Sequence, residues 1–307
     1  MQQPLVAIHL CTYNGASFLQ QQLESFARQS LGDFTILASD DGSTDTTLDM
    51  LNVAAAGMLA GRLQIVEGPR RGVNANFLSV AAQPEPPARY IAYSDQDDIW
   101  DHDKLERAVA WLDTVDPAVP ALYGTRTRLI DRDGKAIGNS PHFKRPAGFA
   151  NALVQNMFGG NTMVFNAAAW RVLKQSNPQD VVSHDWWTYI AVTAVGGRIR
   201  YDAEPSLSYR QHENNLVGAN TSWAARLERA RQLRQGRFAQ WNSTNIAALA
   251  PLRPSMLPDN AKVLADFEQA RSTGFPANLL WLVRSGVYRQ TALADIGLWL
   301  ATMSGRL

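Results

Sequence analysis

The stretch that decides the fold is Tyr90-Ile91-Ala92-Tyr93-Ser94-Asp95-Gln96-Asp97-Asp98-Ile99-Trp100. Its apolar start predicts a short buried strand, and three carboxylates follow within four residues. Ligands of α/β sheets bind beyond the carboxyl ends of the strands, so a charged site is expected here. Like charges this close are unfavourable unless a cation neutralises them, and carboxylate oxygens suit Mg²⁺ or Mn²⁺ rather than zinc. The alternative is a solvated acidic turn.

Three more apolar runs precede this stretch and predict strands at residues 5–10, 34–38 and 63–66. After each of the four strands, apolar residues at helical spacing predict helices at residues 17–27, 45–58, 74–82 and 105–112. This alternation predicts βαβ units and a parallel sheet. Right-handed crossovers place the loops after such strands at one edge of the sheet. We therefore expect convergence of the polar loops at residues 12–15, 40–45 and 95–98.

Beyond Pro120 the alternation weakens. We predict strands at residues 121–123, 125–130 and 198–201, with a hairpin-like turn at residues 131–134. A loop leads into a strand at residues 158–165, and helices are predicted at residues 166–175 and 185–195. From Ser222 onward the pattern is helical and rich in arginine.

Composition indicates an ordinary globular protein of 307 residues, with 46% hydrophobic and 19% charged residues. Cys11 is the only cysteine, so no internal disulfide forms and a reducing compartment is favoured. We expect a cytoplasmic protein, because the start lacks the pattern of a signal peptide and no apolar run approaches the length of a membrane span. Charge is unevenly distributed: residues 220–307 hold 11 Lys and Arg against 5 Asp and Glu, whereas residues 1–219 hold 18 against 23. A basic C-terminal third suggests an anionic partner.

Further polar residues have candidate roles. Asp40-Asp41-Gly42 follows the second predicted strand, where a carboxylate of a nucleotide fold can bind a base or a ribose, although a helix cap with a turn glycine is the commoner role. Asp185 stands beside Trp186 and Trp187, and we expect these rings to bury its carboxylate in part, as suits a general base; the alternative is a helix N-cap with both tryptophans in the core. His212 is either structural or a ligand for Mn²⁺.

Two common nucleotide-binding classes are disfavoured. There is no G-x-G-x-x-G after the first strand and no P-loop motif, which argues against a Rossmann dehydrogenase and a P-loop NTPase.

The order and spacing of three motifs resemble family-2 glycosyltransferases, which have the GT-A fold: Thr12-Tyr13-Asn14-Gly15, Asp40-Asp41-Gly42-Ser43-Thr44-Asp45 and Ser94-Asp95-Gln96-Asp97-Asp98-Ile99-Trp100. Two later motifs resemble the bacterial rhamnosyltransferase-like branch, which extends polysaccharides such as the O-antigen of lipopolysaccharide: His184-Asp185-Trp186-Trp187 and Tyr209-Arg210-Gln211-His212. The resemblance covers about residues 5–215.

The fold that this resemblance implies is α/β, with a Rossmann-like, mostly parallel central sheet flanked by helices and a helical C-terminal extension. A GT-A catalytic domain is expected over residues 1–219, with a nucleotide-sugar half at about 1–120 and an acceptor half at about 121–219. A basic helical region is expected over residues 220–307.

The resemblance also implies roles for individual residues. Those expected to bind the nucleotide-sugar are Thr12, Tyr13, Asn14, Asp41, Asp95 and Gln96, with Arg71, Asn74 and Asn76 nearby. Mn²⁺ or Mg²⁺ would be held by Asp97, Asp95 and His212. Asp185 would be the catalytic base. The sugar and acceptor side would be formed by Asp98, Trp100, Gly159, Gly160, Asn161, Thr162, His184 and Trp186.

The implied activity is that of a metal-dependent inverting glycosyltransferase. It would move a sugar, such as L-rhamnose, from a dTDP- or UDP-sugar to a hydroxyl of a growing, lipid-linked polysaccharide. The sequence lacks the Gln-x-x-Arg-Trp motif of processive synthases in that family, so repeated addition to one chain is not expected. Two alternatives stay open: an inactive carbohydrate-binding or assembly protein, and a sugar-phosphate nucleotidyltransferase. The latter usually begins with a Gly-rich loop containing Arg and Lys, which residues 10–15 do not provide.

The C-terminal region offers a partner surface. In residues 222–241 one helical face is expected to carry Trp223, Leu227, Ala230 and Leu233, while five arginines occupy much of the rest. Such a basic amphipathic helix suits an anionic membrane, here the inner face of the cell membrane, and residues 279–300 would add apolar surface. The alternative is packing against the catalytic domain or a second subunit. Nucleic acid is not an expected partner, because no binding module accompanies the charge.

Overall fold

The computed structural model describes residues 3–178, 180–212 and 236–307. The chain divides into two compact units. Residues 1–142, 158–174 and 198–218 form the first unit, and residues 143–157, 175–197 and 219–307 form the second. The first unit thus contains all four predicted strand–helix repeats and the three polar loops.

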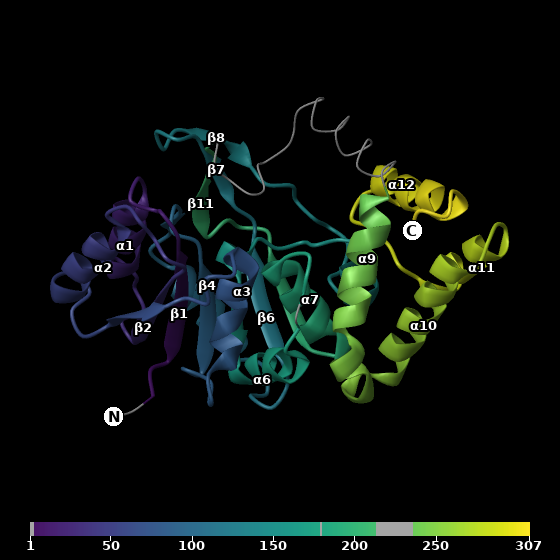
Figure 1. Ribbon diagram of the computed structural model, residues 1–307, viewed down its shortest axis with the longest axis horizontal. Helices are drawn as coiled ribbons and strands as arrows, with labels where there is room; N and C mark the ends of the chain where they lie inside the picture. The colour runs from purple at the N-terminus through teal and green to yellow at the C-terminus, as the bar shows by residue number, and fades with distance from the viewer. Residues whose placement is uncertain (1–2, 179, 213–235) are drawn as a thin grey trace. The chain divides into compact units, whose positions relative to one another are not determined.

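A mostly parallel seven-stranded sheet organises the first unit, in the order β10-β6-β9-β4-β1-β2-β3. Figure 1 labels β2, β1, β4 and β6 of this sheet. Its strands are β1 (Val6–Thr12), β2 (Phe34–Asp40), β3 (Leu63–Glu67), β4 (Tyr90–Ser94), β6 (Ala121–Thr125), β9 (Val164–Asn166) and β10 (Arg198–Asp202). β1 pairs in parallel with both β2 and β4, whereas β9 runs antiparallel to β4 and β6. The predicted mostly parallel sheet is confirmed.

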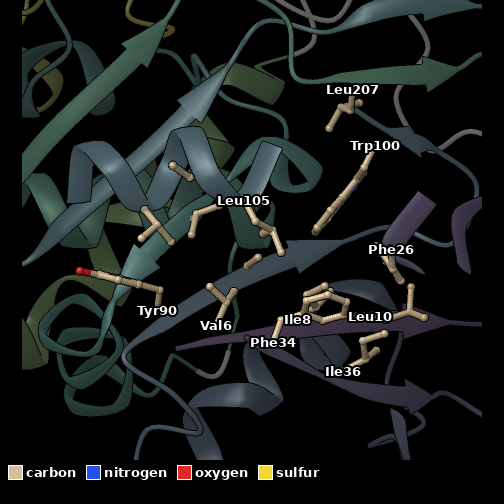
Figure 2. Close-up of a cluster of buried hydrophobic side chains, with 14 of the residues drawn as sticks. Val6, Ile8, Leu10, Phe26, Phe34, Ile36, Tyr90, Trp100, Leu105 and Leu207 are labelled. Atoms are coloured by element: carbon tan, nitrogen blue, oxygen red, sulfur yellow. The ribbon is translucent and has the colours of Figure 1, made fainter. Parts of the chain in front are cut away.

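One face of this sheet is covered by α1 (Leu19–Ala27), α2 (Thr47–Ala56) and α4 (Lys104–Leu112). Alternate residues of β1 and β2 point to this side, where Ile8, Leu10 and Ile36 pack against Phe26 and Leu105 (Figure 2). Side chains of this kind contribute about 1.5–3 kcal/mol each when fully buried. The residues between them point to the other face, because side chains along a strand alternate.

The opposite face is covered by α3 (Val73–Leu78) and the short 3₁₀ helix η1 (Ser79–Ala82). Phe77 of α3 packs edge-on against Tyr93, with ring centroids 5.3 Å apart, and Tyr93 packs on Phe165 at 5.0 Å. Helices therefore flank both faces of the sheet, as the α/β prediction requires.

The start of α1 differs from the prediction. The helix begins at Leu19 rather than at Ser17, and Phe18 at its N-cap makes no side-chain cap bond. The amides of Phe18 and Leu19 both donate to the carbonyl of Gly15, each at 3.1 Å, so a separate turn precedes the helix. Ala27, the last residue of both the predicted helix and α1, is exposed.

A second sheet in the first unit joins β5 (Ile99–Trp100), β11 (Leu207–Arg210), β7 (Arg128–Ile130) and β8 (Ala136–Asn139) in that order. The strand predicted at residues 125–130 is therefore divided between two sheets, since β6 ends at Thr125 and β7 begins at Arg128. The predicted turn at residues 131–134 joins β7 and β8, with Gly134 in the left-handed region at φ 87°. Pairing of β11 with β5 brings residue 210 next to the acidic stretch.

The second unit is helical. Its helices are α5 (Phe149–Ala152), α7 (His184–Ala194), α9 (Arg237–Ala248), η3 (Ala250–Ser255), α10 (Pro258–Ser272), α11 (Ala277–Ser285) and α12 (Ala292–Met303), while α6 (Ala167–Ser176) begins in the first unit. The predicted C-terminal helices are present. We predicted a basic helix over residues 222–241. Residues 222–235 of it, which include Trp223, Leu227, Ala230 and Leu233, lie outside the described residues. In the described part of the chain, no helix has both the length and the apolar character needed to cross a membrane.

Candidate active site

The loops after β1 and β2 are tied together by hydrogen bonds. The amide of Asn14 donates to Ser43 Oγ at 2.9 Å, and the amide of Thr44 donates to Asn14 Oδ1 at 2.8 Å. Gly15 N donates to Thr47 Oγ1 at 2.8 Å. Asn14 adopts φ 48°, a left-handed conformation that asparagine tolerates better than most residues. The expected convergence of these two loops is confirmed.

The loop after β4 is joined to the loop after β1 by one amide side chain. Gln96 Oε1 accepts from the backbone N–H of Tyr13 at 2.9 Å, and Gln96 Nε2 donates to the carbonyl of Tyr13 at 3.0 Å. A Cβ at Gly15 would lie 2.1 Å from Gln96 Oε1, so this approach requires glycine. Tyr13 itself is 58% exposed. All three polar loops therefore meet at the carboxyl edge of the sheet.

Two adjacent carboxylates after β2 have different surroundings. Asp40 is buried and accepts from Thr12 Oγ1 at 2.8 Å and from the amide and hydroxyl of Ser43 at 2.8 and 2.6 Å. Asp41 is half-buried and accepts from the amides of Arg70 and Gly72 at 2.6 and 2.9 Å. Asp40 thus holds the loop, whereas Asp41 faces the segment after β3. The sequence did not distinguish Asp40 from Asp41 by their residue type, and the family resemblance assigned the nucleotide to Asp41 alone.

The segment after β3 carries three residues predicted near the nucleotide-sugar, Arg71, Asn74 and Asn76, and they differ in exposure to solvent. Arg71 is exposed and Asn74 is half-buried. Asn76 is buried, where Nδ2 donates to the carbonyl of Ser39 at 2.9 Å and Oδ1 accepts from Ser39 Oγ at 2.5 Å. Arg71 therefore lies at the surface of this edge, and Asn76 fastens α3 to β2.

The acidic stretch after β4 carries the densest charge. Asp95 and Asp97 are half-buried, and Asp97 Oδ2 lies 2.8 Å from His212 Nε2. Asp98 is fully buried, accepts from Asn161 Nδ2, and accepts from the amide of Arg210 at 3.3 Å. Burial raises the pKa of Asp98 well above its usual value, and the charges of Asp97 and Asp95 raise it further. Asp98 therefore faces the interior, and Asp97 faces His212.

The side chains of the acidic stretch and His212 fit a divalent cation that is also bound by a substrate. Within residues 3–178, 180–212 and 236–307, no three His, Cys, Asp or Glu side chains gather closely enough to enclose a metal ion by themselves. Mg²⁺ and similar ions, however, are usually bound by one or two carboxylates together with substrate phosphates and water. Asp97, with the adjacent imidazole of His212, meets that requirement.

The predicted sugar and acceptor residues of the first unit are mostly buried. Gly160, Asn161 and Thr162 form the 3₁₀ helix η2 (Gly160–Thr162). The side chain of Asn161 connects this helix to Asp98, because its Nδ2 donates to the Asp98 carboxylate. Trp100 is 3% exposed and packs edge-on against Phe26, with ring centroids 4.8 Å apart. Trp100 therefore belongs to the hydrophobic core in this structure.

Arg210 is a central residue of the site that sequence reasoning did not assign. It is 1% exposed; Nε donates to the carbonyl of Asp97 at 3.1 Å, Nη1 to the carbonyl of Arg132 at 2.8 Å, and Nη2 to Gln21 Oε1. Its guanidinium also lies over the ring of Phe18, 4.8 Å from the centroid. Arg210 thus connects the acidic stretch with α1 and the β7–β8 turn. The sequence did contain a signal for Arg210, because it lies two residues before His212, a candidate metal ligand.

We predict that Arg210→Met lowers both stability and activity. Three carbonyl or amide oxygens lose a charged donor, and each hydrogen bond to a charged group contributes about 1.5–3 kcal/mol. The backbone of Asp97 loses its support, so turnover should fall together with the melting temperature. Thermal unfolding and initial rates, compared with those of Arg132→Met on the same turn, check this. An unchanged melting temperature would contradict the connecting role.

The second unit contains the other three predicted site residues. His184 and Trp186 are buried at the start of α7, and Asp185 is half-buried in its first turn. Trp186 Nε1 donates to the carbonyl of Ala152 at 2.7 Å, and burial lowers the pKa of His184 to about 4, against the opposing charge of Asp185. Among these three side chains, Asp185 is the one with substantial exposure to solvent.

Comparison with known proteins identifies relatives. The chain is 30% identical over 234 residues to dTDP-rhamnosyl transferase RfbG of Shigella flexneri, which covers 72% of this chain and 77% of that protein. Solved structures that share its fold include two complexes with nucleotide-sugars. S. aureus TarS 1-349 in complex with UDP-GlcNAc has a TM-score of 0.55 at 14% identity, covering 98% of this chain and 90% of that one. The mannosyltransferase PcManGT of Pyrobaculum calidifontis, in complex with GDP-Man and Mn²⁺, has a TM-score of 0.52 at 20% identity, covering 97% and 88%.

These similarities agree with the geometry of the three converging loops and with the GT-A fold. Residues 7–173, which include all three loops, match Glycosyl transferase family 2. Membership in that family also removes the nucleotidyltransferase alternative. The chain belongs to glycosyl transferase family 2 and is a glycosyltransferase.

Proposed function

We propose that the protein is a metal-dependent inverting glycosyltransferase that uses a nucleoside-diphosphate sugar. The observation that carries this proposal is the hydrogen-bonded meeting of the three loops, which brings Asp41, Asp95 and Asp97 to one edge of the sheet. RfbG, a dTDP-rhamnosyl transferase by name, supports dTDP-L-rhamnose as the donor.

We assign roles in binding the nucleotide-sugar from the exposure of each side chain to solvent. Asp41, which is half-buried beside the amides of residues 70 and 72, is suited to accept hydrogen bonds from a base or ribose. Tyr13, 58% exposed, offers a ring face to the nucleoside, and Asn14 adds an amide. Arg71 offers an exposed cation to the diphosphate. Thr12 acts through Asp40, which its hydroxyl contacts.

Asp97, Asp95 and His212 are the residues that would hold Mn²⁺ or Mg²⁺. When bound, such an ion acts as a Lewis acid that stabilises the negative charge developing on the departing diphosphate. Asp95 and Asp97 bring two negative charges to this place, and Gln96 and Arg210 fix the backbone that carries them. The Mn²⁺ in the PcManGT structure supports a divalent ion for this fold.

Asp185 is the proposed base. Its carboxylate takes the proton from the acceptor hydroxyl while that oxygen forms a bond to the anomeric carbon. The bond between that carbon and the diphosphate oxygen breaks on the opposite face, and the nucleoside diphosphate leaves with the electron pair. A single displacement inverts the configuration and needs no covalent enzyme intermediate. Its half-buried place in the first turn of α7 supports this role.

The first test is donor turnover by the purified protein with Mn²⁺ or Mg²⁺. A panel of dTDP-, UDP- and GDP-sugars is offered together with lipid-linked saccharides extracted from membranes, and released nucleoside diphosphate is measured. Metal-dependent release from dTDP-L-rhamnose is the expected result. Tight saccharide binding without release from any donor would instead favour an inactive carbohydrate-binding protein.

A lipid-linked acceptor gives the enzyme a reason to contact an anionic membrane, and α12 offers a surface for it. Spacing along the helix places its large exposed apolar residues on one face: Leu293 (76% exposed), Ile296 (56%), Trp299 (42%), Leu300 (59%) and Met303 (49%). The opposite side of α12 is also apolar but buried, at Leu298 and Ala301. The exposed Arg284 and Arg306 lie near this face in sequence. Apolar faces of helices accompanied by arginine bind anionic bilayers.

We predict that the protein co-sediments with vesicles of phosphatidylglycerol and phosphatidylethanolamine. The double variant Leu293→Ser/Leu300→Ser should bind at least about tenfold more weakly, since transfer of two exposed leucine side chains from water into the bilayer contributes several kcal/mol. Val53→Ser removes a side chain of α2 that is 72% exposed and serves as the control. A dimer that dissociates in the double variant, with no vesicle binding by the wild type, would assign the face to a second copy instead.

A further inference from the structure

Lys104, the first residue of α4, is buried in the first unit beside the acidic stretch. It is 1% exposed, and its Nζ donates to the carbonyl of Asn161 at 3.0 Å and more weakly to that of Thr162 at 3.4 Å. The same Nζ lies over the ring of Trp100, 4.5 Å from the centroid. A fully buried lysine is rare unless it is paired, so these contacts require an explanation.

The partners of Lys104 lead directly to the site. Asn161, whose carbonyl Lys104 holds, donates from Nδ2 to the carboxylate of Asp98. Asp98 neighbours Asp97, and its other oxygen accepts from the amide of Arg210. Lys104 therefore acts on the backbone of η2, and the Asn161 side chain transmits the position of η2 to the acidic stretch.

The hydrogen bonds between Lys104 and η2 do not require the ammonium charge. Burial lowers the pKa of Lys104 to about 7; the charges of Asp98 and Asp101 oppose this shift and that of Arg107 adds to it. A neutral amine keeps two N–H donors, and these match the two carbonyls of η2. The contact with η2 can thus persist in either protonation state.

We propose that Lys104 is a positioning residue for sugar transfer: it fastens η2 to α4 and so holds the Asn161 amide on Asp98. The role rests on the proposed function. Methionine at position 104 would leave the two carbonyls buried without their donor, at a cost of about 1–3 kcal/mol for each group. The turn would then loosen where the acceptor side is expected. The donor-binding loops keep their own ties through Gln96 and Ser43.

The test compares Lys104→Met with a matched control elsewhere in the first unit. Lys174 makes the same kinds of contact at the surface: it is exposed, its Nζ donates to the carbonyls of Gln83 and Pro84 at 2.8 and 2.5 Å, and it lies 5.0 Å from the centroid of Trp170. In Lys104→Met we expect kcat to fall about 10–100-fold, as for other supporting partners of active-site groups. Affinity for the nucleoside diphosphate should stay at the wild-type value. Lys174→Met should change neither quantity.

A second readout does not depend on activity. The amides of Thr162 and Met163 donate to the carbonyls of Gly159 and Gly160 at 2.9 Å, so their hydrogen exchange reports on η2. Exchange at both amides should accelerate in Lys104→Met and stay unchanged in Lys174→Met. Lys104→Gln, which keeps a shorter N–H donor, serves if Lys104→Met does not fold and should give a smaller acceleration. Unchanged exchange in the folded variant would overturn the role of Lys104, whereas faster exchange in a protein without transferase activity would leave it intact and contradict only the proposed function.

Discussion

Asp185→Asn is expected to lower kcat by about 10²–10⁴-fold, the usual contribution of a general base. The amide cannot accept the proton of the acceptor hydroxyl, so the oxygen must attack before it has lost its proton. The residues proposed to bind the donor, Tyr13, Asn14, Asp41 and Arg71, are unchanged in this variant, so the KM for the donor should stay close to that of the wild type. Initial rates over a range of donor and acceptor concentrations measure both quantities.

A matched control for this variant is Asp259→Asn. Asp259 occupies the same place in α10 as Asp185 does in α7, in the first turn of a helix of the second unit, but it is exposed. Loss of helix-end charge costs both variants about 0.3–1 kcal/mol of stability. Only Asp185→Asn should lose turnover. Equal rates in the two variants would rule out Asp185 as the base, and retention of the anomeric configuration in the product would contradict a single displacement.

Asp97→Ala is expected to abolish metal-stimulated transfer, with a loss of at least about 100-fold, because loss of a residue that only supports a metal ligand already costs about 10–100-fold. The substitution removes the carboxylate that lies 2.8 Å from His212 Nε2. Metal titration at saturating donor should show a raised requirement for Mn²⁺ or Mg²⁺, and affinity for the nucleoside diphosphate in the presence of metal should fall as well. This dependence on metal distinguishes Asp97→Ala from Asp185→Asn.

Two further variants make this test specific. His212→Ala removes the neighbouring imidazole and should give a smaller loss of the same kind. Asp116→Ala removes an exposed carboxylate that accepts from the amide of Ala118, before β6, and should leave the metal requirement unchanged. If Asp97→Ala keeps the metal requirement of the wild type, the metal is not bound at this aspartate.

The sequence alone determined the sheet and the meeting of the loops. Apolar runs such as residues 5–10 and 90–93 are local signals of buried strands, and regular alternation with helices permits few topologies. The carboxyl ends of parallel strands lie at one edge, so the convergence of residues 12–15, 40–45 and 95–98 required no knowledge of side-chain packing. The motifs in these loops were sufficient to indicate the family.

Tertiary structure decided what each side chain in the loops does. Asp40 and Asp41 are neighbours of the same chemistry, yet one is buried against Thr12 and Ser43 while the other faces the amides of residues 70 and 72. Trp100, expected on the sugar and acceptor side, is buried in the hydrophobic core. Asn76, expected near the nucleotide-sugar, is hydrogen-bonded to Ser39. Residue type alone does not distinguish such roles, because exposure depends on packing partners distant in the sequence.

The supporting roles of Lys104 and Arg210 could not be predicted from the sequence for the same reason. Lys104 acts on Asn161 and Thr162, and Arg210 acts on Asp97 and Gln21, across separations of 57 to 189 residues. Periodicity and turn signals extend over only a few residues, so no local pattern announces such a contact. Burying a lysine or an arginine becomes favourable only when the folded chain supplies carbonyl and amide oxygens at hydrogen-bonding distance, and that supply exists only in the tertiary structure.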